Sequence, residues 1–73
     1  SREHARVRLG SSRFVLVDCS TNGTYISRDD GRDPVRIHRE SFPLSGRGVI
    51  GLGVDPAEVP DDRDALVRFV FTP

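Results

Sequence analysis

Apolar residues occur along the chain in short runs rich in β-branched and aromatic side chains, and glycine, proline, asparagine and aspartate separate these runs. This pattern is typical of strands joined by turns, whereas a helix repeats its apolar positions every three to four residues. The chain is therefore predicted to be all-β. The expected strands are 5–9, 14–17, 24–26, 35–37, 49–52 and 65–71.

Residues 5–9 alternate strictly between apolar side chains and arginine. Because successive side chains of a strand point to opposite faces, Ala5, Val7 and Leu9 are expected to face a core while the arginines face water. A turn of glycine and serine then leads into 14–17, the expected hairpin partner.

The segments between strands also carry readable signals. The Asn-Gly pair at 22–23 is a strong turn signal, since both residues tolerate positive φ. Residues 28–34 form a charged loop, 46–48 a turn, and 55–64 a long acidic loop with two prolines. Pro43 restricts its surroundings to an edge strand or an irregular segment, because proline has no N–H for a central strand.

The length and charge of the chain limit what it can do. With 73 residues it forms one domain, and eleven basic residues balance eleven acidic ones. This zero net charge excludes the electrostatic footprint of a dedicated nucleic-acid binder or of a protein that binds anionic membranes. All eleven basic residues are arginine, a bias that a GC-rich genome explains without any functional meaning.

Cys19 is the single cysteine, so the chain has no intrachain disulfide and no cysteine-based metal site. It is more consistent with a small packed residue than with a redox switch. No secretory signal and no long apolar span are present, which favours the cytoplasm. We expect no cofactor and no metal.

Two loop motifs carry the candidate chemistry. One is Ser-Arg-Glu-His at 1–4, directly before the first strand, and the other is Asp-Cys-Ser-Thr-Asn-Gly-Thr at 18–24, between the second and third. Hydroxyl and amide side chains beside turn backbone can bind phosphate oxygens, and loops on a rigid sheet are where binding groups concentrate.

Together with Val-Ile-Gly-Leu-Gly at 49–53, these motifs resemble the second half of a forkhead-associated (FHA) domain, a phosphothreonine-binding module. The resemblance covers essentially the whole chain. It implies an FHA-like (SMAD/FHA) antiparallel β-sandwich of six to seven strands, with residues 1–73 as a single N-terminally truncated domain. It also implies phosphothreonine-peptide recognition in signalling, with no enzymatic activity. Residues 28–40 are similar to a charged insertion in FHA domains of bacterial signalling proteins.

The resemblance implies a role for each matching residue. Ser1 donates its hydroxyl to the phosphate, and Arg2 contributes its backbone N–H. Thr21 places a second hydroxyl near the phosphate, while Asn22 hydrogen-bonds the backbone of the ligand.

The remaining motif residues support the site in this interpretation. His4 braces the two loops against each other and Gly23 permits the turn, with Ser20 and Thr24 supporting the same loop.

FHA domains also carry a Gly-Arg pair upstream of the Ser-x-x-His motif, and that arginine makes a charge-assisted contact with phosphate. The Gly-Arg pairs at 31–32 and 46–47 follow the motif and are not this pair by chain order. Losing such a hydrogen bond weakens affinity about ten- to hundredfold, so weak binding is expected.

Two other interpretations compete with a phosphate reader. A serine hydrolase built from Ser20, His4 and Asp18 lacks any oxyanion-hole or nucleophile-elbow motif. The stronger alternative is an FHA-like structural or assembly module that packs on a neighbouring domain or dimerises. Missing first strands would leave strand edges unpaired, which predicts a homodimer through an exposed edge.

Overall fold

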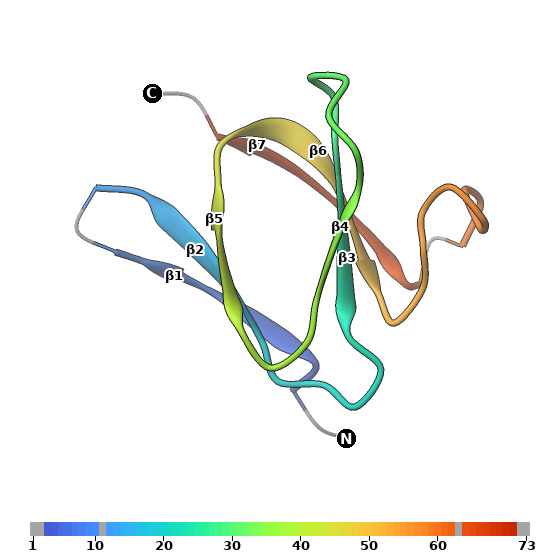
Figure 1. Ribbon diagram of the computed structural model, residues 1–73, viewed down its shortest axis with the longest axis horizontal. Coiled ribbons are helices and arrows are strands. Elements are labelled where there is room, and N and C mark those ends of the chain that lie inside the picture. Colours follow the sequence, from blue (N-terminus) through green and yellow to red (C-terminus); the bar gives the residue numbers. More distant parts are fainter. Residues whose placement is uncertain (1–2, 11, 63, 72–73) are drawn as a thin grey trace.

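The computed structural model describes residues 3–10, 12–62 and 64–71. These residues form two antiparallel sheets that pack as a β-sandwich, and they include no helix (Figure 1). One sheet has the strand order β1-β2-β5 and the other β4-β3-β6-β7. The strands are β1 (Ala5–Leu9), β2 (Phe14–Asp18), β3 (Thr24–Arg28), β4 (Val35–Ile37), β5 (Ser41–Leu44), β6 (Gly46–Leu52) and β7 (Leu66–Phe71). The predicted all-β, FHA-like fold with six to seven strands is confirmed.

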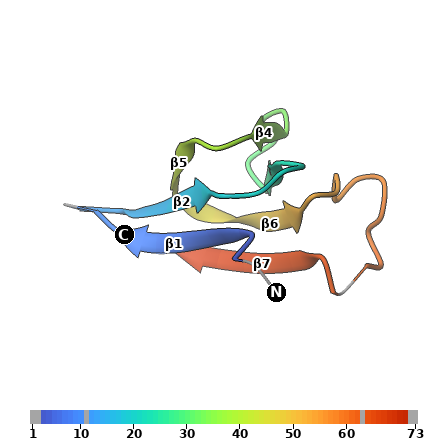
Figure 2. The same ribbon diagram turned by 90° about the horizontal axis from the view of Figure 1, so that it is seen from below.

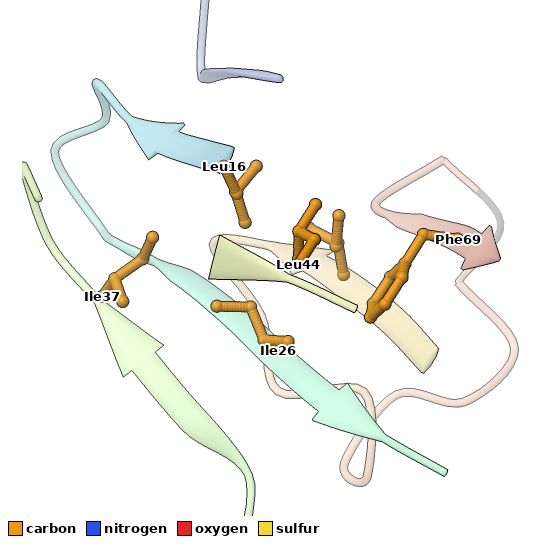
Figure 3. Close-up of a cluster of buried hydrophobic side chains, with 6 residues drawn as sticks. Leu16, Ile26, Ile37, Leu44 and Phe69 are labelled. Carbon is orange, nitrogen blue, oxygen red and sulfur yellow. The ribbon is translucent and has the colours of Figure 1, made fainter. Parts of the chain in front are cut away.

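The core lies between the two sheets and draws one large side chain from nearly every strand (Figure 3). Alternation places these side chains on the inner faces, where burial of each stabilises the fold by about 1.5–3 kcal/mol. The buried hydrophobic residues are Leu16, Ile26, Ile37, Leu44, Ile50 and Phe69.

The first strand differs from the prediction. β1 and β2 form the expected hairpin, with Ala5 opposite Asp18 and Leu9 opposite Phe14. Ala5 packs against the core, but Val7 and Leu9 are 48% and 66% exposed, so the prediction that both face a core is wrong. The physical reason is position in the sheet, because β1 is an edge strand and its outer half lies beyond the core cluster.

The segment around Pro43 is an edge strand, as predicted. β5 pairs only with β2, and Pro43 lies opposite Val15 in that pairing. Since β5 has a neighbour on one side only, the missing N–H of Pro43 breaks no second ladder.

Residues 46–48 do not form the predicted turn. They are the first residues of β6 and pair with β7, and Gly48 also pairs with Arg28 of β3. A Cβ on Gly48 would collide with the carbonyl oxygen of Ser27 and the ring of Phe69. Glycine here therefore permits close approach of a neighbouring strand, a role that sequence alone does not distinguish from a turn.

The candidate loops gather at one end of the sandwich. Figure 1 shows the segment before β1, the β2–β3 loop and the β4–β5 connection together at the lower end. Residues 53–62, in the connection after β6, project beyond the sheets in both Figure 1 and Figure 2. The sandwich thus presents His4 of the first motif and the 18–24 motif at a common end.

Candidate functional site

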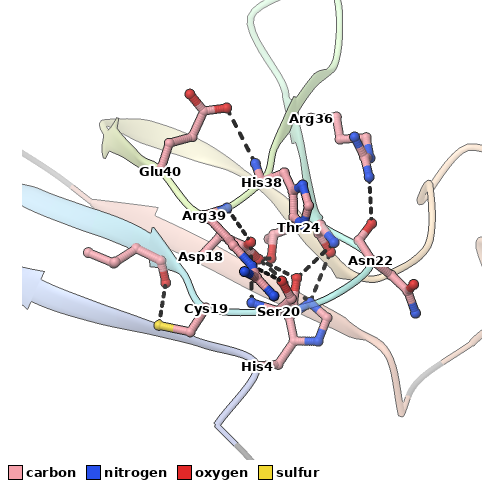
Figure 4. Close-up of polar contacts among 12 residues, drawn as sticks. His4, Asp18, Cys19, Ser20, Asn22, Thr24, Arg36, His38, Arg39 and Glu40 are labelled. Atoms are coloured by element: carbon pink, nitrogen blue, oxygen red, sulfur yellow. Dashed lines mark hydrogen bonds and ion pairs between the residues drawn. The ribbon is translucent and has the colours of Figure 1, made fainter.

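The β2–β3 loop is buried at its base and exposed at its tip (Figure 4). Asp18 ends β2 and Thr24 begins β3, and the two residues are only 3% and 0% exposed. Ser20 is also buried, whereas Thr21 and Asn22 are exposed. The loop therefore presents two polar side chains to solvent on a fixed base.

The base is a hydrogen-bonded network around the Asp18 carboxylate. The hydroxyls of Ser20 and Thr24 both donate to Asp18 Oδ1, at 2.7 and 2.5 Å. The backbone N–H groups of Ser20 and Arg39 donate to Oδ2, at 3.3 and 2.7 Å. Ser20 Oγ in turn accepts from the backbone N–H of Gly23 at 2.7 Å, which closes the loop.

Two opposing effects set the pKa of Asp18. Burial raises it, because a charged carboxylate loses its water. The hydrogen bonds from Thr24, Arg39 and Ser20 outweigh burial and lower the pKa from 3.8 to about 2. Asp18 is therefore a carboxylate at neutral pH, and its negative charge is matched by donors from three segments of the chain.

His4 joins the segment before β1 to the loop. Its Nε2–H donates to the backbone oxygen of Gly23 at 2.9 Å, and its own backbone oxygen accepts from the N–H of Cys19 at 2.9 Å. Gly23 O also accepts from the N–H of Gly53, at 3.1 Å. The position proposed for a bracing histidine is thus in contact with both ends of the loop.

Gly23 adopts a backbone conformation that favours glycine, with φ at 90°. A Cβ at this position would lie 2.9–3.0 Å from the guanidinium of Arg36. Both the positive φ and the close approach of Arg36 therefore favour glycine at this turn.

Several residues of the network were not identified from the sequence. Asp18 entered the sequence analysis only as part of a motif and of the rejected hydrolase triad, although an aspartate side chain commonly accepts from the backbone N–H two residues on, as Asp18 does from Ser20. Arg36 of β4 and Arg39 of the β4–β5 turn carry no such local signal, since their contacts to Asn22 and Ser20 join residues 14 and 19 positions apart and depend on how the strands pair.

Other predicted site features have mixed outcomes. Ser1 and Arg2 lie outside the described residues. Cys19 is exposed, contrary to the expectation of a packed residue, because it follows the buried Asp18 on the outward side of the chain. The triad arrangement is absent, since among the described residues Ser20 Oγ donates to Asp18 and His4 Nε2 contacts Gly23 O.

Two further features, a metal-ion site and a membrane-spanning helix, are absent from the described residues. Within 3–10, 12–62 and 64–71, no group of three or more histidine, cysteine or acidic residues is arranged to hold a metal ion. The same residues contain no helix long and apolar enough to cross a membrane.

The sandwich thus carries a hydrogen-bonded polar loop at one end, and loops positioned by a rigid scaffold are where binding groups concentrate. The family model for the FHA domain matches residues 1–53, a span that holds both loop motifs and ends at Gly53. The chain belongs to the FHA domain family, which is a family of protein-interaction domains and not of enzymes. No curated protein and no solved structure matched the chain.

Proposed function

We propose that this domain binds phosphothreonine-containing peptides of a partner protein through the tip of the β2–β3 loop and performs no catalysis. One observation carries the proposal. Thr21 and Asn22 are exposed at the tip, while the residues on either side of them are buried and hydrogen-bonded.

The geometry suits an extended ligand that carries a phosphate. Thr21 offers a hydroxyl to phosphate oxygens, and Asn22 offers an amide that can both donate to and accept from a peptide backbone. Among the described residues, neither side chain has a hydrogen-bond partner within the chain. The backbone oxygen of Asn22, by contrast, accepts a hydrogen bond from the Arg36 guanidinium. A loop fixed before binding loses less conformational entropy when the ligand arrives.

The remaining contacts of the proposed site come from Ser1 and Arg2, which precede β1. His4 lies next to them in sequence and contacts the β2–β3 loop through Gly23 O. That contact supports placing the hydroxyl of Ser1 and the backbone N–H of Arg2 at the same end of the sandwich.

The test is fluorescence-polarisation binding of degenerate phosphothreonine, phosphoserine and unphosphorylated peptide libraries. Thr21→Ala and Asn22→Ala remove the proposed contacts. Ser12→Ala is the matched control. Ser12, like Thr21, is an exposed residue with a hydroxyl, but it precedes β2 and Thr21 follows β2, so the two residues lie at opposite ends of that strand. We expect phosphate-dependent binding, strongest for phosphothreonine, that both loop variants weaken and the control retains. Equal binding of phosphorylated and unphosphorylated libraries would contradict the proposal.

A second candidate function is assembly without phosphate recognition. β1 and β7 are edge strands, and Leu9 and Val70 are 66% and 63% exposed. Unpaired, apolar strand edges favour association with another chain, and a second copy is the simplest partner. Sedimentation velocity over a range of concentrations separates the two functions. A dimer that forms with no phosphopeptide binding favours assembly, and a monomer that binds phosphopeptide excludes it.

A further inference from the structure

The three-stranded sheet has an outer face that points away from the core. Leu16 of β2 is buried in the core, and successive side chains of a strand point to opposite faces, so Val15 and Val17 point outward. The register of the hairpin places Arg8 opposite Val15 and Arg6 opposite Val17. Residues directly opposite each other on paired strands share a face, so these two arginines and two valines form one surface. We call these four residues the basic face.

The arginines of the basic face have little negative charge near them. Both are exposed, and the one carboxylate within salt-bridge distance of either among the described residues is that of Glu3, whose Oε2 lies 3.9 Å from Arg6 Nη1. A pair as exposed as this one contributes little attraction. Asp18 is the only acidic residue of β1, β2 and β5, and it is buried in the loop network. The face therefore presents positive charge next to half-buried apolar side chains.

The connection between β6 and β7 carries the opposite charge. Residues 55–64, which we call the acidic connection, hold five acidic residues and one arginine, and both Glu58 and Asp61 are exposed. Its backbone folds into turns, in which the N–H groups of Glu58 and Val59 both donate to the backbone oxygen of Asp55, at 2.9 and 3.2 Å. Within the described residues, no carboxylate of this connection lies within salt-bridge distance of an arginine.

The basic face and the acidic connection do not meet within one molecule. Figure 1 and Figure 2 both show the β1–β2 hairpin on one side of the sandwich and the connection after β6 on the other. Surfaces of complementary charge guide association and fix its register. A contact between two different patches of identical chains is heterologous, because each copy offers one patch and receives the other.

We propose that the acidic connection of one copy docks on the basic face of a second copy of this chain. Its exposed carboxylates pair with Arg6 and Arg8, and its apolar residues cover the two valines between them. The contact uses the outer face of a sheet, so it goes beyond phosphopeptide binding and is also separate from pairing of the edge strands. Because each ion pair is exposed, the association is weak and decreases as salt is added.

Sedimentation velocity of the full 73-residue chain, over a range of concentrations at low and at high salt, tests the contact. The face variant, Arg6→Glu/Arg8→Glu, reverses the charge of one surface. The connection variant, Glu58→Arg/Asp61→Arg, reverses that of the other. The rescue variant combines all four substitutions and has the same net charge as the unsubstituted chain.

The matched controls make the same charge changes elsewhere. Arg47→Glu/Arg68→Glu alters two exposed arginines of the four-stranded sheet, and Asp29→Arg/Asp33→Arg alters two exposed aspartates between β3 and β4. Each control therefore has the net charge of the variant that it matches. Circular dichroism verifies that every variant is folded.

We expect the unsubstituted chain to associate at low salt and to dissociate as salt is added. The face and connection variants should each weaken association at least about tenfold, because attraction between two pairs of charges becomes repulsion. The rescue variant should restore it, and the controls should change it less than about threefold. In ¹⁵N NMR spectra of the unsubstituted chain, the backbone amides of 6–8, 15–17 and 57–62 should shift on dilution.

Five results would overturn the inference. They are a monomer at every concentration in low salt, association that neither reversal weakens, an equal loss in the matched controls, a folded rescue variant that stays monomeric, and dilution shifts confined to other residues. The dilution shifts decide the matter if a variant does not fold. Association that is insensitive to both reversals assigns the contact to the edge strands. None of these results affects the proposed function, because no phosphopeptide is present in the experiment.

Discussion

The two ends of the β1–β2 hairpin are held by different interactions. At one end, the Asp18 carboxylate and the hydroxyls of Ser20 and Thr24 form a buried network in which each polar group has a partner. At the other end, Leu9 and Phe14 lie at an open groove of about 580 Å³ that is also lined by Phe71 and Leu44. The side chains of Leu9 and Phe14 pack at that end but remain 66% and 39% exposed to solvent.

The comparison shows which end is suited to specific recognition. A satisfied polar network fixes the direction of every donor and acceptor, so it can hold exposed side chains such as Thr21 in one geometry. Apolar stacking, such as that of Phe14 on Phe71 with ring centroids 4.8 Å apart, is less directional. The polar end therefore suits a ligand of defined chemistry, whereas the apolar end suits less specific hydrophobic contacts.

The largest expected effect comes from removing the centre of the polar network. Asp18→Ala leaves two hydroxyls and two N–H groups without their acceptor, and we expect a loss of about 3 kcal/mol in the free energy of unfolding. Urea denaturation measures it. Asp61→Ala, at an exposed position, is the control and should change stability by less than about 0.5 kcal/mol. Equal losses for the two substitutions would show that the hydrogen-bonded network around Asp18 does not contribute to the free energy of unfolding.

Acidification tests the same end without mutation. Because the pKa of Asp18 is lowered to about 2 in the folded state, its stabilisation is fully present above the ordinary value of 3.8 and is lost as pH falls towards 2. The loss attributable to this group is about 2 kcal/mol. Carboxyl-carbon NMR titration checks the cause directly. An Asp18 transition near pH 4 in the folded protein would contradict the network.

Gly23→Ala should disturb the polar end by a smaller amount. The substitution places an alanine at φ 90° and crowds Arg36, so we expect a loss of about 2 kcal/mol. Gly31→Ala is a close control, because Gly31 has φ 84° but open space around it, and should cost about 1 kcal/mol. Thermal denaturation measures the stability of both variants, and the difference between their losses reports the steric clash with Arg36. A control that loses as much stability as Gly23→Ala would remove Arg36 from the explanation.

The smallest effect is expected at the apolar end. Leu9→Ala should change the free energy of unfolding by less than about 0.5 kcal/mol, since this side chain is 66% exposed. The same substitution at Leu16, which is 2% exposed, should cost about 3 kcal/mol. Urea midpoints of the two variants compare them. A large loss for Leu9→Ala would mean that the groove end is covered in solution, for example by a second copy of the chain.

Local patterns predicted most of the fold. Alternation located β1, the glycine-serine turn after it indicated β2 as its hairpin partner, and the Asn-Gly pair marked the turn before β3, because these signals act within a few residues. Burial of Val7 and the nature of residues 46–48 depended on which strands become neighbours. An edge strand and a glycine that admits a neighbouring carbonyl look the same in sequence as a central strand and a turn.

The candidate site divides in the same way. The family motif pointed to Thr21 and Asn22, and both lie exposed at the loop tip. It did not reveal Arg36 and Arg39 as neighbours of the loop, because their contacts to Asn22, Ser20 and Asp18 join residues 14 to 21 positions apart. The contacts of Asp18 with Ser20 and Thr24 are local, but its role as their common acceptor is completed by the N–H of the distant Arg39. Long-range contacts of this kind arise from sheet topology, which no local motif encodes.

The most direct test of phosphothreonine recognition at the polar end is an NMR titration of the ¹⁵N-labelled domain with a phosphothreonine peptide, with the unphosphorylated peptide as reference. The account predicts that the largest phosphate-dependent shifts fall on the backbone amides of 20–24 and Arg39 and on the side-chain amide of Asn22. Shifts concentrated at the groove around Leu9 and Phe14, or equal shifts with both peptides, would contradict it.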